Sequence, residues 1–487
     1  MSVLFFRDNL DQIAIDGGFP VGGFRLILTL IACCFVAPFV HLLRSETSRH
    51  LFNVAVGLYA GVFVFDFAVL HTIVSAIVVY GLMLVAPRNI VGKLVLTLML
   101  AYLVVVHYYR EYKSPEIVWD AAQMILTLKL SSIAINYSDA VLPKEQKTPT
   151  ILKNEQQELP ALIPYLGFVF FFPTYLAGPA FEYKDYVNWI KDNRSAPFTV
   201  HLRNLVVVIV SGVGFFLSLQ FPVDRIDSPD FHPESSWAVR CLFMCVHVML
   251  FRFRFYVAWS LAEAASALAG VGYVPETGKW NGITNNDILC VELPVNIRVG
   301  INNWNMGVAR WLNTYIYQRV GLSKSGKPGL LSTMSSFFVS AMWHVSRSSM
   351  RMVYSLLSGL SPGYYLFFIL GGIYIEVGKH LRRRLRPMFH YTEDRHMYPH
   401  AIFLTYFKGQ SHPLAFFYDI AGLFVTWVGM QYAGIAFEIL DVRRCIAIWS
   451  SWYFLPHIIA IGLLVFFNAV PQRRRSKEAT VSKPKAE

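Results

Sequence analysis

Long apolar stretches alternate with shorter polar ones along nearly the whole of this 487-residue chain. A helix needs about 20 mostly apolar residues to cross the hydrocarbon layer of a bilayer. Stretches of roughly that length recur, and the pattern predicts roughly ten to twelve hydrophobic elements. They cover residues 24–43, 51–70, 71–86, 89–108, 119–142, 161–178, 203–221, 238–270, 330–343, 364–378, 415–439 and 445–470. Several are short or broken by proline or glycine, and 238–270 is long enough to contain a bend or two helices.

The apolar stretches are continuous and do not alternate with period two, which favours helices over the strands of a transmembrane barrel. The sequence therefore predicts an all-α fold, a polytopic bundle of transmembrane helices that encloses a chamber. Residues 1–471 are expected to form one membrane-embedded domain. Composition agrees, because 55% of the residues are hydrophobic and only 15% are charged. The longest polar interruptions, expected to be loops or surface helices, lie at about 143–159, 182–202, 222–237, 272–303 and 379–414.

The net charge of +12 is concentrated in two basic segments, "KHLRRRLRP" (379–387) and "QRRRSKEATVSKPKAE" (472–487). An excess of Lys and Arg beside membrane spans favours the cytosolic side, so both segments are predicted to be cytosolic and 472–487 to be a basic tail. Beside spans, this interpretation is preferred to nucleic-acid binding, and contact with anionic lipids is compatible with it. Lys483 and Lys485 resemble a dilysine retrieval signal, which predicts residence in the endoplasmic reticulum membrane.

Two polar side chains in apolar surroundings are candidates for function, because polar groups are costly to bury in a membrane. His344 closes the stretch "LLSTMSSFFVSAMWH", and Asn305 lies near the start of "WNMGVARWLNTYIYQ" (304–318), which the pattern predicts to be a helix. On a helical wheel, Asn305 falls on the apolar face with Val308, Ala309, Leu312 and Ile316, opposite Arg310, Thr314 and Gln318. Taken alone, a buried histidine such as His344 is more often structural, and an asparagine such as Asn305 more often caps a helix or hydrogen-bonds a neighbouring one.

A third polar group interrupts "FRFRFYVAWSLAEA" (251–264), where Arg252, Arg254 and Glu263 stand among apolar residues. Arg254 and Glu263 could pair with each other or with neighbours instead of acting on a substrate. None of the six cysteines has metal-ligand spacing, and His344 has no second His, Cys or carboxylate at such spacing. No metal site is therefore predicted.

Several strings together resemble the membrane-bound O-acyltransferases, and within them most closely the lysophospholipid acyltransferases. The resemblance runs through most of the chain, and the strings occur in the family's order. They are "MILTLKLSSIAINYSDA" (124–140), "LAGPAFEYKDYVNW" (176–189), "FRFYVAWSLAEAASALAGVGY" (253–273), "NNDILCVEL" (285–293), "WNMGVARWLNTYIYQR" (304–319), "SAMWH" (340–344) and "GLSPGYYLFF" (359–368).

The resemblance implies that Asn305 and His344 occupy the family's two active-site positions. A neutral imidazole suits the removal of a hydroxyl proton near pH 7, so His344 is the expected general base. The Asn305 amide would stabilise charge on the thioester oxygen or orient the imidazole. The expected substrate-binding residues are Trp304, Trp311, Arg254, Glu263, Tyr364 and Tyr365, although core packing accounts for the aromatic ones equally well.

The expected reaction moves a long-chain acyl group from acyl-CoA to the free glycerol hydroxyl of a lysophospholipid that arrives from the bilayer. Acyl-CoA is a co-substrate, and no cofactor is expected. Lys324, Lys327 and Arg319 could meet the CoA phosphates, or could simply be solvated. Two other classes stay open: an acyltransferase of the same family acting on a sterol, diacylglycerol or protein, and a membrane transporter. A transporter would favour symmetry between the halves of the chain, which the sequence does not display.

One segment departs from the family pattern. In the family, the active-site His is followed at once by Gly and soon by "PGYYL", whereas here "VSRSSMRMVYSLLS" (345–358) intervenes. Removing residues 345–358 would restore the family spacing. An insert beside a catalytic base either displaces it or loops out, and a displacement of about 1 Å can cost on the order of 100-fold in rate. The sequence therefore also leaves open a non-catalytic member of the family.

Overall fold

The computed structural model describes residues 2–113, 119–226, 236–320, 329–344, 362–389 and 414–470. Over these ranges the chain is almost entirely helical, and its described strands form one short antiparallel hairpin, β1 (Tyr273–Val274) with β2 (Lys279–Trp280). This agrees with the all-α prediction. The insert 345–358 and the tail 472–487 lie outside the described residues.

The first part of the chain forms α1 (Ser2–Asp16), α2 (Val21–Val36), η1 (Ala37–Leu42), α3 (Glu46–Phe65), η2 (Asp66–Ala68), α4 (Val69–Val85), α5 (Arg88–Lys113), α6 (Trp119–Asp139), η3 (Lys144–Gln146), α7 (Pro149–Asn154), α8 (Leu162–Val169), α9 (Phe172–Tyr175), α10 (Tyr183–Asp192), α11 (Phe198–Ser218) and η4 (Val223–Arg225). The second part forms α13 (Trp237–Phe251), α14 (Phe253–Leu268), α15 (Ile288–Glu292), α16 (Ile297–Asn302), α17 (Met306–Leu312), the π-helical turn η5 (Asn313–Tyr317), α18 (Leu330–Trp343), α19 (Pro362–Arg384), α20 (Arg386–Phe389), α22 (Ala415–Ile439), α23 (Val442–Ser451) and α24 (Leu455–Ala469).

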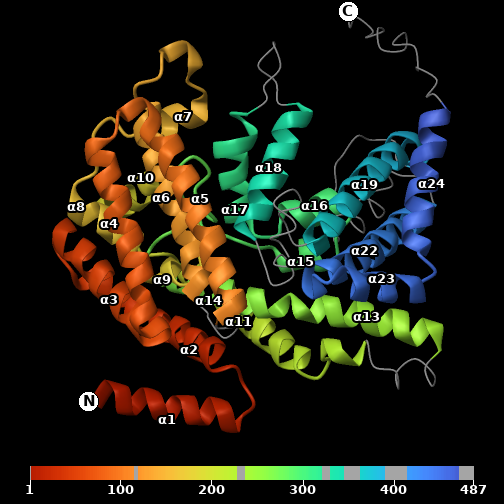
Figure 1. Cartoon of the computed structure of the whole chain (residues 1–487), viewed down its shortest axis with the longest axis horizontal. Coiled ribbons are helices and arrows are strands. Elements are labelled where there is room, and N and C mark those ends of the chain that lie inside the picture. The colour runs from red at the N-terminus through yellow and green to blue at the C-terminus, as the bar shows by residue number, and fades with distance from the viewer. Residues whose placement is uncertain are drawn as a thin grey trace, which may run out of the picture.

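The helices gather into two groups with α15 to α18 between them (Figure 1). One buried cluster unites α2 to α6 with α8, α9, α10 and α14, and a second unites α13 with α19, α22 and α23. The predicted element 238–270 divides into two helices, because α13 ends and α14 begins at Arg252. Since α13 packs on α22 and α14 packs on α2 and α11, this pair joins the two groups.

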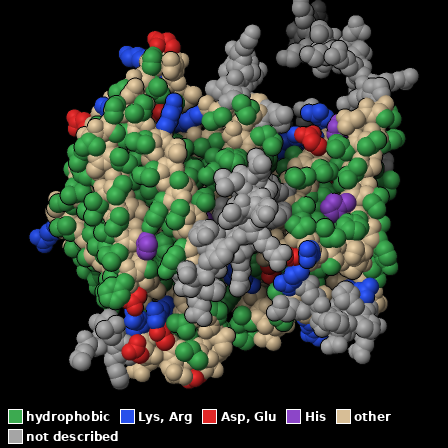
Figure 2. Space-filling view, in the orientation of Figure 1, with side chains coloured by type: hydrophobic (Ala, Val, Ile, Leu, Met, Phe, Trp, Pro, Cys, Tyr) green, Lys and Arg blue, Asp and Glu red, His purple; other side chains and the backbone are tan. Residues whose placement is uncertain are grey.

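By length and composition, six helices or continuous helix pairs in the described ranges can cross a membrane. They are Val21–Leu42, Glu46–Val85, Arg88–His107, Phe198–Ser218, Trp237–Leu268 and Ala415–Ile439, and the pair α23 and α24, bent by 85°, adds a seventh if it is one span. Figure 2 shows a mostly hydrophobic surface over α3, α4 and α5, with charged side chains gathered toward the ends of these helices. A multi-pass membrane protein fits both observations.

This number is below the ten to twelve predicted elements, because several apolar stretches are too short or too interrupted to be spans. The stretch 161–178 divides into α8 and α9, of eight and four residues, and the stretch 330–343 corresponds to α18, of 14 residues. α9 is buried throughout and α8 is mostly buried over its second half, whereas α18 exposes Leu331, Met334 and Phe338.

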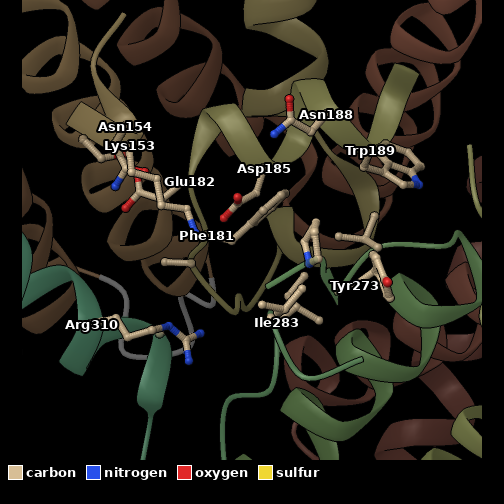
Figure 3. Close-up of a pocket in the computed structure, with 18 of the residues that line it drawn as sticks. Lys153, Asn154, Phe181, Glu182, Asp185, Asn188, Trp189, Tyr273, Ile283 and Arg310 are labelled. Carbon is tan, nitrogen blue, oxygen red and sulfur yellow. The ribbon is translucent and has the colours of Figure 1, made fainter. Parts of the chain in front are cut away.

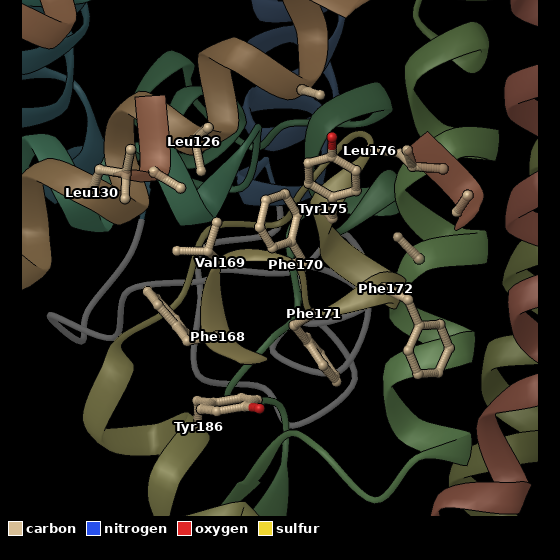
Figure 4. Packing of buried hydrophobic residues seen from close by; sticks show 14 of the residues in the cluster. Leu126, Leu130, Phe168, Val169, Phe170, Phe171, Phe172, Tyr175, Leu176 and Tyr186 are labelled. Atoms are coloured by element: carbon tan, nitrogen blue, oxygen red, sulfur yellow. The ribbon is translucent and has the colours of Figure 1, made fainter. Parts of the chain in front are cut away.

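The largest core surrounds the aromatic stretch 168–176, which is buried between α3, α6 and α10 (Figure 4). Phe171 lies at its centre, with ring centroids 5.6 Å from Phe181 and 5.2 Å from Trp189. α3 can approach this stretch closely because position 57 is glycine: a Cβ there would lie 1.9 Å from the carbonyl oxygen of Phe170. The close packing of α3 against Phe170 is possible only because residue 57 has no side chain.

Gly57→Ala should therefore lower the unfolding temperature of the detergent-solubilised protein by several degrees, because overpacking a core typically costs about 1–3 kcal/mol. The matched control is Gly81→Ala in α4, where a Cβ would meet nothing within 4 Å. That variant should match or slightly exceed the parent, because Ala is the better helix former. Thermal scanning by fluorescence-detected size-exclusion chromatography makes the comparison, and equal unfolding temperatures for both variants would contradict the packing argument.

Candidate active site

An apolar cavity of about 290 Å³ lies between α13, α16, α17, α18, α19 and α22. Aromatic and aliphatic side chains supply most of its wall, including Phe337, Phe367 and Phe437. Asn305 and His344, far apart in the sequence, both line it. The cavity thus combines an acyl-compatible wall with a side chain that can accept a proton and one that can donate a hydrogen bond.

Asn305 reaches the cavity from the residue before α17, and not from within a continuous helix as the sequence predicted. Its backbone is left-handed (φ 45°, ψ 55°), and α17 begins only at Met306. The predicted helix 304–318 is interrupted again where α17 passes into the π-helical turn η5. The side chain of Asn305 caps no backbone amide of α17 and forms no hydrogen bond with the described residues. Its amide is therefore available to the cavity.

The start of α17 is held by Asn285, which is fully buried. The backbone oxygen of Asn285 accepts from Met306 N at 2.7 Å, and its Oδ1 accepts from Gly307 N at 2.9 Å. A Cβ on Gly307 would lie 3.0 Å from both Asn285 Oδ1 and Ala180 O, so glycine permits this close approach. Two amides that the first turn of α17 leaves without helical partners are satisfied in this way, which fixes the residue before them.

His344 lies at the other end of the same wall, directly after α18. The preceding Trp343 anchors this helix end, because its Nε1 donates to Met124 O at 2.9 Å and its backbone oxygen lies 3.3 Å from His107 Nε2. The His344 ring packs edge-on against Trp343 and Phe437, with centroid distances of 4.6 and 5.6 Å. Its position thus depends on contacts with α5, α6 and α22.

The far end of the α17 segment is clamped by a polar network. The Tyr315 hydroxyl in η5 donates to Glu182 Oε2 at 2.7 Å and accepts from Asn136 Nδ2 at 2.9 Å. Arg319 pairs with Asp139 through two hydrogen bonds of 2.7 and 2.8 Å. Desolvation raises the pKa of Glu182, and the hydrogen bonds from Tyr315 and Asn136 partly oppose that rise. Because α17 is held at both ends, Asn305 sits on a rigid element.

One charged group reaches the apolar cavity. Arg252, at the bend between α13 and α14, lines it and pairs with Glu292 at the end of α15. Arg252 Nε donates to Glu292 Oε1 at 2.8 Å, Arg252 Nη1 donates to Gln431 Oε1 at 2.9 Å, and the Tyr256 hydroxyl donates to Glu292 Oε1 at 2.6 Å. Arg252 and Glu292 are only 9% and 7% exposed, so their charges neutralise each other inside the protein.

Comparison with known proteins bears on this geometry directly. The model of the membrane-bound O-acyltransferase family matches residues 104–407, which contain both Asn305 and His344. The chain belongs to the membrane-bound O-acyltransferase family. The resemblance found in the sequence is thereby confirmed.

Among the relatives of this O-acyltransferase, the lysophospholipid acyltransferase of Schizosaccharomyces pombe is 29% identical, over 91% of this chain and 86% of that protein. Lysophospholipid acyltransferase 2 of Arabidopsis thaliana is 26% identical, over 95% and 97%. Membrane-bound glycerophospholipid O-acyltransferase 2 of Homo sapiens is 25% identical, over 92% and 84%. The similarity covers nearly the whole O-acyltransferase chain in each case.

The predicted substrate-binding residues of the O-acyltransferase divide among different places. Trp304 lines the apolar cavity and packs edge-on against Trp259, with ring centroids 5.0 Å apart. Trp311 is buried on the other side of α17, where its Nε1 donates to Leu128 O at 3.1 Å. The side chains of Tyr364 and Tyr365 lie outside the described residues, as do Lys324 and Lys327.

Arg254 and Glu263 do not pair with each other and do not line the apolar cavity. The Arg254 guanidinium lies over the Phe251 ring, 4.1 Å from its centroid. Glu263 accepts a 2.9 Å hydrogen bond from the Thr284 hydroxyl. Sequence analysis instead overlooked Glu292 and Asn285, although the string "NNDILCVEL" contains both, because nothing local indicates that they reach Arg252 and α17.

Glu292→Ala should destabilise the O-acyltransferase severely, because a buried pair that loses one partner typically costs about 3–5 kcal/mol. The double variant Arg252→Met with Glu292→Leu removes both charges and should unfold at a higher temperature than Glu292→Ala. Lys153→Ala serves as the control, since it breaks only an exposed pair with Glu276 and should change little. If thermal scanning found Glu292→Ala as stable as the parent, the neutralising role of the pair would be wrong.

Proposed function

We propose that this O-acyltransferase moves a long-chain acyl group from acyl-CoA to the free glycerol hydroxyl of a lysophospholipid. The observation that carries the proposal is the convergence of Asn305 and His344 on one apolar cavity. Relatives from a yeast and a plant are named lysophospholipid acyltransferases, which supports the choice of acceptor. The reaction needs no cofactor beyond the acyl-CoA co-substrate.

In the proposed mechanism, His344 accepts the proton of the lysophospholipid hydroxyl as its oxygen attacks the thioester carbonyl. The C–O bond forms, the C–S bond breaks, and the CoA sulfur leaves as a thiolate that takes the proton back from the imidazolium. The Asn305 amide donates to the carbonyl oxygen while that oxygen carries negative charge. A fixed donor in an apolar cavity stabilises this charge more strongly than water-exposed donors do, because the local dielectric is low.

The proposal includes a location. Residues 379–387 and 472–487 are expected to face the cytosol, where acyl-CoA is available, and Lys483 and Lys485 are expected to retain the protein in the endoplasmic reticulum membrane. The acceptor would enter from the bilayer, which the exposed hydrophobic helices contact. Trp304 would contact the substrates in the cavity.

His344→Ala should reduce acyl transfer by at least about 100-fold, within the range that general-base catalysis contributes. The assay uses microsomes that contain the protein, acyl-CoA and lysophospholipids with choline, ethanolamine, serine and inositol head groups. Asn305→Ala should lower kcat with little change in KM, because the proposed hydrogen bond strengthens as charge develops.

The matched control is His201→Ala, which removes a histidine whose Nε2 contacts only its own helix start at Ala196 O. It should retain the parental rate. Turnover that survives His344→Ala would overturn the assignment of the base. If none of the four lysophospholipids were acylated but a sterol, diacylglycerol or protein were, the proposed acceptor would be wrong. The protein would then be an acyltransferase of the same family that acts on that other acceptor.

The segment 345–358 supplies a separate prediction, because it directly follows the proposed base. The chain without residues 345–358 should be at least as active as the full chain, since the deletion restores the family spacing after His344. His344→Ala in the shorter chain is the control and should be inactive. Loss of activity in the shorter chain, at equal expression, would show that the segment contributes to the site.

A further inference from the structure

A second cavity, of about 400 Å³, lies on the opposite side of α17 (Figure 3). Three of the long polar interruptions of the sequence meet around it: α7 from 143–159, α10 from 182–202, and the β1–β2 hairpin from 272–303. Its fourth wall is the face of α17 and η5 that carries Arg310 and Thr314. We call this cavity the polar pocket. The proposed reaction does not use it.

The charges around the polar pocket are only partly neutralised. Lys153 pairs with Glu276 at 3.3 Å, and Arg194 pairs with Asp192 at 3.4 Å. Those four side chains leave no net charge. Asp185, by contrast, has no hydrogen-bond or ion-pair partner in the part of the chain that the structure describes.

Arg310 is the matching unpaired cation. Among the described residues it donates only to Thr284 O, at 3.3 Å, and forms no ion pair. Asp185 enters the pocket from α10 and Arg310 from α17, on opposite walls, and both side chains are exposed (Figure 3). Opposite charges that face a common space without meeting form a site for a ligand that carries both signs.

We propose that the polar pocket binds a zwitterion that carries a phosphodiester and an ammonium group, with the phosphate at Arg310 and the ammonium at Asp185. This is the chemistry of a phospholipid head group, free or still attached to its lipid. Glu182, which also lines the pocket, would support the ammonium end. The choice of a phosphodiester over a carboxylate rests on the proposed function, whereas the two-charge requirement rests on the pocket alone.

The geometry favours this ligand over simpler ones. The planar guanidinium of Arg310 can form two parallel hydrogen bonds with two oxygens of a phosphate. A ligand that carries only an ammonium group has no acceptor for these bonds. Phe181, Trp189 and Tyr273 add apolar surface to the lining, and the Tyr273 ring already lies under the Arg194 guanidinium, 4.8 Å from its centroid. Phosphate alone would leave Asp185 unpaired, and an amine alone would leave Arg310 unpaired.

The test measures binding to the full-length His344→Ala protein in nanodiscs, so that the result does not depend on turnover. The probe is glycerophosphoethanolamine, titrated by calorimetry against glycerol 3-phosphate, ethanolamine and γ-aminobutyrate. The zwitterionic phosphodiester should bind at least ten-fold more tightly than each of the other three. Lysophosphatidylethanolamine is then added to the nanodisc as a competitor. If it displaces the probe, the pocket accepts the head group while it is attached to a lipid; if it does not, the pocket accepts the free head group. Either result supports the assignment.

Two variants locate the site. Arg310→Gln should weaken the probe at least ten-fold and leave ethanolamine unchanged, and Asp185→Asn should weaken the probe and leave glycerol 3-phosphate unchanged. Arg310→Lys should restore part of the affinity, and Lys379→Gln, which removes an exposed charge from α19, should change nothing.

The outcomes separate the two proposals. Equal binding of γ-aminobutyrate would overturn the phosphodiester, and equal binding of either half-ligand would overturn the zwitterion. No binding at millimolar concentration would overturn the site. None of these results bears on acyl transfer, because catalysis is tested separately through His344 and Asn305.

Discussion

The structure depends on the neutralisation of one buried charge. Arg252 interrupts the hydrophobic stretch 238–270 at the point where α13 ends and α14 begins. An unpaired guanidinium in an apolar interior costs far more than a bend or a mispacked side chain. Glu292 from α15 and Gln431 from α22 both accept hydrogen bonds from Arg252. These bonds connect the junction of α13 and α14 to α15, which precedes α17, and to α22 in the second helix group.

Arg252 of this pair lies on the wall of the apolar cavity, which limits what the cavity can hold. Arg252 and Glu292 cancel as charges, and the hydrogen bonds from Tyr256 and to Gln431 occupy groups that would otherwise attract water. The cavity therefore stays suited to an acyl chain although an arginine lines it. The pair contributes to the specificity of the arrangement more than to its stability, since well-packed apolar residues would be at least as stable in its place.

α17 turns this framework into two compartments. Its apolar side, with Val308, Ala309 and Leu312, faces the cavity that contains Asn305 and His344. Its polar side, with Arg310 and then Thr314 in η5, faces the polar pocket. The two faces of this short amphipathic segment therefore meet different chemistry, an apolar wall on one side and polar side chains on the other. Three polar segments of the chain converge on the polar side.

The sequence predicted the helical fold and the two candidate residues of the cavity, but not the contacts between distant segments. Continuous apolar stretches predicted helices, and the wheel of 304–318 correctly placed Val308, Ala309 and Leu312 opposite Arg310 and Thr314, because side-chain periodicity is a local property. Ile316, which the wheel put on the same apolar face, is instead buried in a cluster with Trp311 and Tyr315. Asn305 and His344 could be singled out because the strings "WNMGVARWLNTYIYQR" and "SAMWH" resemble the family, although the segment 345–358 departs from it directly after His344. The sequence could not predict the partner of Arg252, the contact of Asn285 with α17 or the separation of Arg254 from Glu263. Each of these depends on which distant segments pack together. The helix start after Asn305 was missed for the same reason.

The left-handed backbone at position 305 narrows which residue can serve there. Most side chains pay roughly 1 kcal/mol or more for this conformation, and glycine, asparagine and aspartate tolerate it best. Glycine would permit the turn but would bring no donor to the cavity. Aspartate would place an unpaired carboxylate in an apolar space, because Arg252 on the cavity wall is already paired with Glu292. Asparagine alone combines the permitted turn with an uncharged donor, so the backbone and the chemistry proposed for the cavity select the same residue independently.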